Sequence, residues 1–159
     1  MHLYLVRHGL ANWPAWSGPD DERPLTPEGA QLIQAEGKAL ARLGLKPELI
    51  LHSPLVRARD TAQLIGEALA IPDRVREHAL LRPGFSAKAL KKLLREHAQI
   101  EDLMLVGHAP DVSEVVQALT GGSVKFKEGT VACVKIEEHA AAPEGTLLWL
   151  APAELLARG

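Results

Sequence analysis

The chain has 159 residues, 47% of them hydrophobic and 24% charged, which suits one folded domain and excludes a disordered chain. The formal net charge is −2 and no long run of lysine or arginine is present, so neither nucleic acid nor a membrane surface is an expected partner. No apolar run approaches the roughly 20 residues that a membrane-spanning helix needs. The single cysteine, Cys133, leaves no internal disulfide and indicates a reducing cytoplasm. We therefore expect a cytoplasmic protein with one domain over residues 1–159.

The beginning of the chain predicts a strand, a long loop and a helix. His2–Val6 is a short apolar run closed by a glycine, which is typical of a buried strand. Ala11–Pro24 mixes Trp, Pro, Gly, Ser and Asp without periodicity and predicts a loop, and a loop of this length is often functional. Thr26 as the N-cap and proline at the first helical position predict a helix over Pro27–Leu43, with Leu43 facing the core and Gly44 ending it.

The middle of the chain repeats this alternation. Glu48–His52 predicts a second strand, and Leu55–Leu69 has apolar residues at helical spacing. Val75–Leu81 is extended but irregular and leads into the turn Arg82–Gly84. Ser86 is the expected N-cap of a third helix that runs to about Ala98.

The last part adds one more strand and helix and then two strands. Asp102–Val106 predicts a strand and Asp111–Leu119 a helix. Val131–Ile136 and Thr146–Leu150 predict strands joined by the polar, Ala-rich stretch Glu137–Gly145. Pattern alone leaves their direction open, and a hairpin is the simplest connection. The alternation up to residue 120 favours an α/β fold with a parallel-rich sheet covered on both faces.

Three predicted strands end in residues with reactive or cationic side chains. The first ends in Arg7-His8-Gly9, the second in His52-Ser53-Pro54 ahead of Arg57, and the third in Gly107-His108. Ligands of open α/β sheets bind beyond the carboxyl ends of the strands, so we expect two histidines and two arginines at one edge. No acidic residue is interleaved among them in the sequence. This pattern predicts a pocket for a multiply charged anion such as phosphate.

Each of these residues has a chemical role suited to a phosphoryl group. Arg7 and Arg57 present planar forks of N–H donors that match phosphate oxygens. His108 and the backbone at Ala109 precede a predicted helix, so the free N–H groups of its first turn can face the same anion. A neutral His8 can attack phosphorus and form a covalent phosphohistidine.

Four sequence blocks resemble those of the histidine phosphatase superfamily, which includes the cofactor-dependent phosphoglycerate mutases. They are Leu5–Gly9, Arg23–Gly29, Ser53–Ala62 and Val106–His108, in the order of the family. The resemblance implies a three-layer α/β/α sandwich around a mostly parallel six-stranded sheet. It also implies that His8 is the nucleophile and that the phosphoryl group is bound by Arg7, Arg57 and His108.

The short chain is most similar to the SixA-type phosphohistidine phosphatases. Larger members carry a glutamate that protonates the leaving group, in the segment where this chain has Glu77 followed by Leu80 and Leu81. Glu77 is therefore the candidate general acid, with Asp20–Glu22 as an alternative. An acid-poor site suits phosphohistidine, because imidazole is a better leaving group than an alkoxide. Asn12 and Arg59 are candidate substrate contacts.

We therefore expect a phosphohydrolase that acts on a phosphorylated protein histidine or on a small phosphorylated metabolite. A small-molecule phosphomonoesterase or a mutase is the enzymatic alternative. The alternative of another class is an inactive module that binds phosphate. No cofactor is expected, and no metal, because the histidines lack the i, i+4 spacing of zinc helices. A monomer or a small homo-oligomer fits the composition.

Overall fold

Six strands form one mixed sheet in the computed structural model, which describes residues 1–137 and 143–159. The strand order is β3-β2-β4-β1-β5-β6. The first four are parallel to one another, whereas β5 runs antiparallel to both β1 and β6. The predicted six-stranded, mostly parallel sheet is therefore confirmed. The strands are β1 (His2–Arg7), β2 (Leu49–His52), β3 (Val75–Glu77), β4 (Asp102–Gly107), β5 (Val131–Glu137) and β6 (Glu144–Ala151).

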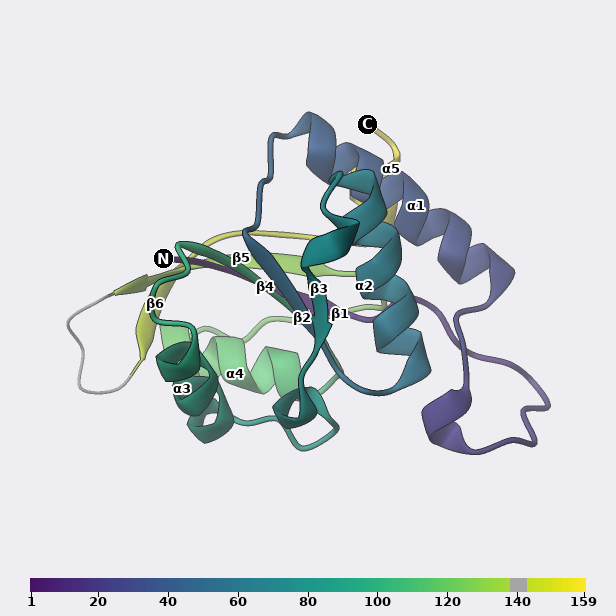
Figure 1. Cartoon of the computed structure of the whole chain (residues 1–159), viewed down its shortest axis with the longest axis horizontal. Helices are drawn as coiled ribbons and strands as arrows, with labels where there is room; N and C mark the ends of the chain where they lie inside the picture. Colours follow the sequence, from purple (N-terminus) through teal and green to yellow (C-terminus); the bar gives the residue numbers. More distant parts are fainter. Residues whose placement is uncertain (138–142) are drawn as a thin grey trace.

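Helices cover both faces of the sheet, so the three-layer α/β/α architecture is confirmed. Figure 1 shows α1, α2 and α5 on one side and α3 and α4 on the other. Among the described residues, none of the helices has the length and apolar character needed to span a bilayer. The α-helices are α1 (Pro27–Arg42), α2 (Val56–Ala68), α3 (Ala87–Glu96), α4 (Asp111–Thr120) and α5 (Ala153–Ala157). Three short 3₁₀ helices are η1 (Asp20–Glu22), η2 (Pro72–Arg74) and η3 (Ala79–Leu81).

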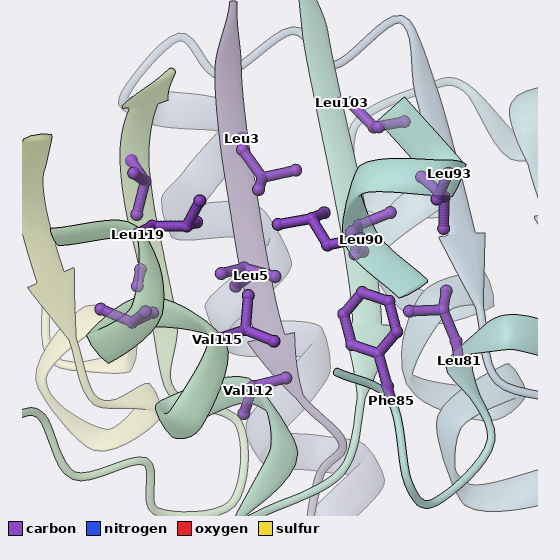
Figure 2. Packing of buried hydrophobic residues seen from close by; sticks show 14 of the residues in the cluster. Leu3, Leu5, Leu81, Phe85, Leu90, Leu93, Leu103, Val112, Val115 and Leu119 are labelled. Carbon is purple, nitrogen blue, oxygen red and sulfur yellow. The ribbon is translucent and has the colours of Figure 1, made fainter. Parts of the chain in front are cut away.

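The central strands are apolar along their whole length because both of their faces are covered. Successive side chains of a strand point to opposite faces. Leu3 and Leu5 of β1 accordingly belong to the cluster formed with α3 and α4, whereas Tyr4 and Val6 pack with α1 and α2. Figure 2 shows Leu3 and Leu5 among the buried side chains of the first cluster. The two cores hold β1 and β4 in a fixed register.

Helix α1 begins as the sequence predicts and ends one residue earlier. The hydroxyl of Thr26 accepts a hydrogen bond from the Gly29 N–H at 3.0 Å, and Pro27 occupies the first turn. Gly44 has a φ of 81°, the left-handed conformation that commonly ends helices. The expectation that Leu43 faces the core is wrong. Its side chain is 64% exposed, because it lies beyond the last helical turn.

Other element boundaries differ from the predictions in detail. Val75–Leu81 divides into strand β3 and the 3₁₀ helix η3, and the sequence pattern does not predict the short helix α5. The direction of the last two strands, which the sequence pattern leaves open, is antiparallel, with β5 and β6 paired from Val131 opposite Ala151 to Glu137 opposite Glu144. Residues 138–142 of the predicted connecting stretch lie outside the described part of the chain.

A carboxyl group is buried between α1 and the segment that precedes β5. Glu36 is fully buried, and in the described part of the chain neither of its oxygens has a hydrogen-bond partner. Burial raises the pKa of Glu36 well above its usual range, so the side chain is held neutral. A Cβ placed on Gly129 would lie 3.5 Å from one of its oxygens. Gly129 in turn donates its N–H to the carbonyls of Arg7 and His8.

We predict that Glu36→Met stabilises the protein, and more so at high pH. The unfolded glutamate loses its proton near pH 4.5, whereas the folded one holds it, so wild-type stability falls as pH rises above that value. Removing the unpaired carboxyl is expected to add about 1–3 kcal/mol to the free energy of unfolding at pH 8, and less at pH 5. Urea unfolding at both pH values measures this.

The matched control is Glu67→Met, the same change at an exposed position of α2. It should change the free energy of unfolding by less than about 0.5 kcal/mol, with no pH trend. Equal effects of the two substitutions would contradict the assignment of a neutral, strained carboxyl at Glu36.

Candidate active site

The carboxyl ends of three neighbouring parallel strands meet at one edge of the sheet. Arg7, the last residue of β1, is paired in register with Gly107, the last residue of β4. His52 at the end of β2 is opposite Val106 of β4. Since His8 and His108 directly follow the paired Arg7 and Gly107, this register brings the two histidine rings together. Their centroids are 5.2 Å apart.

A cavity of about 390 Å³ opens over this edge. Both histidines and both arginines of the predicted cluster line it, and so do Asn12 and Ala109. The other lining residues come from the loop after β1, from the turn before α3 and from the segment before β5. They are Leu10, Ala11, Asp20, Arg23, Pro83 and Glu128.

The His8 ring is fixed by one hydrogen bond at its Nδ1 atom. This nitrogen lies 2.7 Å from the carbonyl oxygen of Gly9. Because a carbonyl only accepts, Nδ1 carries the proton and Nε2 keeps its lone pair. Burial, above all, lowers the pKa of His8 to about 3, and the neighbouring His108, Arg57 and Arg7 lower it further. The ring is therefore neutral at physiological pH, which is the form a nucleophile requires.

A threonine hydroxyl joins the backbone at His8 to the backbone at Arg57. The Gly9 N–H donates to Thr61 Oγ1 at 2.9 Å, and that hydroxyl donates to the Arg57 carbonyl at 2.8 Å. The N–H of His8 donates to the Gly107 carbonyl at 3.0 Å. The hydrogen bonds of His8 and of the next residue, Gly9, therefore connect the end of β1 to both α2 and β4.

His108 is positioned by Ser53, the residue that follows strand β2. The Nε2 atom of His108 lies 2.8 Å from Ser53 Oγ, and that oxygen also accepts the Leu55 N–H at 3.2 Å. Burial is the main cause that lowers the pKa of His108 to about 4, followed by the charge of Arg57. His108 is therefore neutral at physiological pH too.

Both arginines have carboxylate partners, so the expectation of a cluster without acidic residues is wrong. Arg57 donates to Asp20 Oδ2 at 3.2 Å and to the Asp20 carbonyl at 2.9 Å. Arg7 is 3.1 Å from Glu128 Oε1 and donates to the Phe126 carbonyl at 2.9 Å. The two carboxylates come from loops distant in sequence, which is why the local pattern does not reveal them.

Each guanidinium still has an unused donor. The Nε–H groups of Arg7 and Arg57 are buried without a hydrogen-bond partner in the described part of the chain. A buried donor without a partner costs free energy, so the described residues of the protein itself do not satisfy either guanidinium completely. The cavity thus combines positive charge with two neutral imidazoles.

Asp20 is held by a second arginine of the same loop. Arg23 donates to Asp20 Oδ1 at 3.0 Å and to the Ala11 carbonyl. The hydrogen bond from Arg23, and then the charge of Arg57, lower the pKa of Asp20 below its usual range. Arg23 lines the cavity, and in the sequence only its place in the block Arg23–Gly29 indicates a role for it.

Two predicted residues do not reach the cavity. Glu77, the candidate general acid, is exposed at the end of the edge strand β3 and is not among the lining residues. Arg59 points away from Arg57 on α2 and pairs with Asp60 at 3.5 Å on the exposed surface. Across residues 1–137 and 143–159, no three His, Cys, Asp or Glu side chains group as metal ligands.

Comparison with known proteins gives a consistent family. The model of the histidine phosphatase superfamily (branch 1) matches residues 3–82. An uncharacterised protein of Picosynechococcus is 39% identical over 123 residues, which cover 77% of this chain and 74% of the relative. Phosphohistidine phosphatase SixA of Escherichia coli is 28% identical over 155 residues, or 94% of this chain and 92% of SixA. A solved structure of the protein histidine phosphatase SixA complexed with tungstate superimposes with a TM-score of 0.85, at 25% identity over 96% of this chain and 97% of that one.

We predict that Asp20→Asn tightens inhibition by inorganic phosphate. The substitution removes a negative charge that competes for Arg57, while the carbonyl contact at the same residue remains. The inhibition constant is expected to fall roughly three- to tenfold at low salt, given the weak screening of nearby charges. Competition against p-nitrophenyl phosphate hydrolysis measures it.

The control is Asp21→Asn, which removes the same charge from the neighbouring residue. Asp21 pairs with Arg82 on the exposed surface, so its loss should change the inhibition constant less. An unchanged or weakened inhibition in Asp20→Asn would show that this carboxylate does not compete with phosphate.

Proposed function

The chain belongs to the histidine phosphatase superfamily and is a phosphatase, and on this basis we propose that His8 is its nucleophile and phosphohistidine in a protein its substrate. The observation that carries the proposal is the state of the His8 ring, which is neutral and has Nδ1 bonded to the Gly9 carbonyl. Its Nε2 lone pair is thereby available in a cavity lined by three arginines, Arg7, Arg23 and Arg57.

In the first step, Nε2 of His8 attacks phosphorus while the bond from phosphorus to the leaving group breaks. Arg7 and Arg57 bind the phosphoryl oxygens and balance their charge. His108 forms a further hydrogen bond with the phosphoryl group. In the second step, water attacks the phosphorus of phosphorylated His8 and the new P–N bond breaks. Inorganic phosphate is released, and the neutral imidazole of His8 is restored.

The carboxylates near the cavity favour a leaving group that needs little protonation. Glu77 is exposed on β3, away from the lining residues. Asp20 is ionised and engaged by Arg23 and Arg57, so it has no proton to give at neutral pH. Glu128, the other carboxylate that lines the cavity, is paired with Arg7. A phosphohistidine that carries a proton on its other ring nitrogen leaves as neutral imidazole, whereas an alkyl phosphate leaves as an alkoxide unless a general acid protonates it. The site therefore suits phosphohistidine better than a sugar phosphate.

The nucleophile is tested by rapid quenching with a labelled phosphohistidine peptide as substrate. Wild-type protein is expected to carry one phosphoryl group on His8, with the alkali stability and acid lability of a P–N bond. His8→Asn should lose hydrolysis by at least about a thousandfold, because the covalent route is removed. It should still bind tungstate, since Arg7, Arg57 and His108 remain.

Hydrolysis that survives in His8→Asn would exclude His8 as the nucleophile. Tungstate binding by a wild-type protein that hydrolyses none of the phosphorylated substrates would identify a phosphate-binding module instead. The two measurements together separate a phosphatase from a binder.

The leaving group is tested by comparing kcat/KM for a phosphohistidine peptide, p-nitrophenyl phosphate and 3-phosphoglycerate. The glycerate is expected to react at least about a hundredfold more slowly than the peptide, the lower end of what a general acid contributes. Equal or faster turnover of the glycerate would contradict the phosphohistidine proposal and favour a small-molecule phosphomonoesterase or mutase.

A further inference from the structure

One face of α3 carries a row of cations. Lys88, Lys91, Lys92 and Arg95 stand at positions i, i+3, i+4 and i+7, which places them on one side of the helix. They line a surface hollow of about 570 Å³ together with Leu80, Ser86 and Ala89. None of these lining residues is acidic. We call this surface, from Lys88 to Arg95 with its floor of Leu80 and Ala89, the α3 basic face.

The α3 basic face carries more positive charge than the helix itself uses. Arg95 lies in the last turn, where the helix dipole favours a cation, and Lys92 precedes Glu96 by four residues. Lys88 with Lys92, and Lys91 with Arg95, are like charges at i, i+4, an arrangement that weakens a helix. Lys88 lies in the first turn, where the helix dipole disfavours a cation, and that turn contains no acidic residue. The opposite side of α3 holds the helix in place through the buried Leu90 and Leu93 (Figure 2). Lys88 therefore does not stabilise the helix, and the four cations together give this face a positive charge that a partner can recognise.

The α3 basic face begins next to the cavity. Pro83 lines the cavity and lies only four residues before the start of α3 at Ala87. The turn between them is tied to α4, because the Gly84 N–H donates to Asp111 Oδ2 at 2.8 Å. Since α3 precedes the parallel strand β4, its axis leads away from the carboxyl edge of the sheet (Figure 1). The row of cations extends for roughly 10 Å along that axis, at about 1.5 Å per residue.

We propose that the α3 basic face docks an acidic surface of the phosphoprotein whose phosphohistidine occupies the cavity, an inference that rests on the proposed function. A row of this length exceeds a single phosphate and matches several carboxylates of a protein. Leu80 and Ala89 provide apolar contacts between the charges, as a protein surface requires. A long polyanion such as nucleic acid is disfavoured, because the chain as a whole has a net charge of −2.

The test compares two synthetic phosphohistidine peptides of about 20 residues, one with a tract of Asp and Glu beside the phosphohistidine and one with Gln and Asn in its place. Wild-type protein is expected to have about a tenfold higher kcat/KM for the acidic peptide at low salt, and a smaller preference at about 0.5 M salt. The triple variant Lys88→Glu, Lys92→Glu and Arg95→Glu should lose or invert the preference. Its kcat for p-nitrophenyl phosphate should stay within about twofold of wild type, because no residue of the cavity changes.

The matched control is Lys38→Glu, Arg42→Glu and Lys46→Glu, which makes the same change in net charge at exposed positions in and after α1, on the other side of the sheet. This variant should keep the preference for the acidic peptide. Circular dichroism of both triple variants checks that they fold. A preference lost equally in both would assign the effect to net charge and overturn docking on α3.

The remaining outcomes separate the two proposals. Equal turnover of both peptides by wild type would overturn docking alone, and so would an unchanged preference in the α3 variant. Hydrolysis of p-nitrophenyl phosphate with turnover of neither peptide would overturn the phosphohistidine substrate and the docking with it. Binding of single-stranded RNA or anionic vesicles to the α3 basic face, without a preference between the peptides, would assign the face to another class of partner.

Discussion

The guanidinium groups of Arg7 and Arg57 line one cavity, and the chain around them is arranged to balance their charge. Glu128 pairs with Arg7, and Asp20 pairs with Arg57. The two imidazoles between them add no charge, because burial and the arginines keep their pKa values low. In the proposed function, a phosphoryl dianion in the cavity takes over the balance of charge that the carboxylates supply without it. The interactions that hold the arginines in place are then of the same kind as those proposed to bind the substrate.

This balance depends on the register of the sheet and on two short segments. The pairing of Arg7 with Gly107 sets the distance between the strand ends from which both histidines extend. The segment before β5 contacts the other side of Arg7 through Phe126 and Glu128, and its Gly129 N–H reaches the carbonyls of Arg7 and His8. Beneath that segment lies the neutral Glu36. The segment that contacts Arg7 and His8 therefore lies over a buried carboxyl that carries no charge.

Local patterns in the sequence were sufficient for the strands, the four long helices and the edge at which the histidines and arginines gather. Each of these follows from periodicity, from a cap such as Thr26 or from the rule that parallel strands end together. The partners of the site follow no such rule. Asp20 contacts Arg57 across 37 residues of sequence, and Ser53 contacts His108 across 55. The local sequence of these segments does not indicate either contact. The position of Glu77 depends on which face of an edge strand it occupies, which a strand of three residues does not reveal.

The hydroxyl of Thr61 has a consequence for how such a site changes over evolutionary time. Because it bonds both the Gly9 N–H and the Arg57 carbonyl, one side chain fixes the spacing between the segment that reacts and the segment that recognises. A substitution of Thr61 disturbs both segments at once, which limits the changes that the site tolerates. The exposed tryptophans of the loop from Ala11 to Pro24 instead donate hydrogen bonds to carbonyls of the same loop. New substrate preferences, in descendants or in engineered libraries, are therefore best sought by varying Trp13 and Trp16, while leaving Thr61 and the Asp20 and Arg23 side chains untouched.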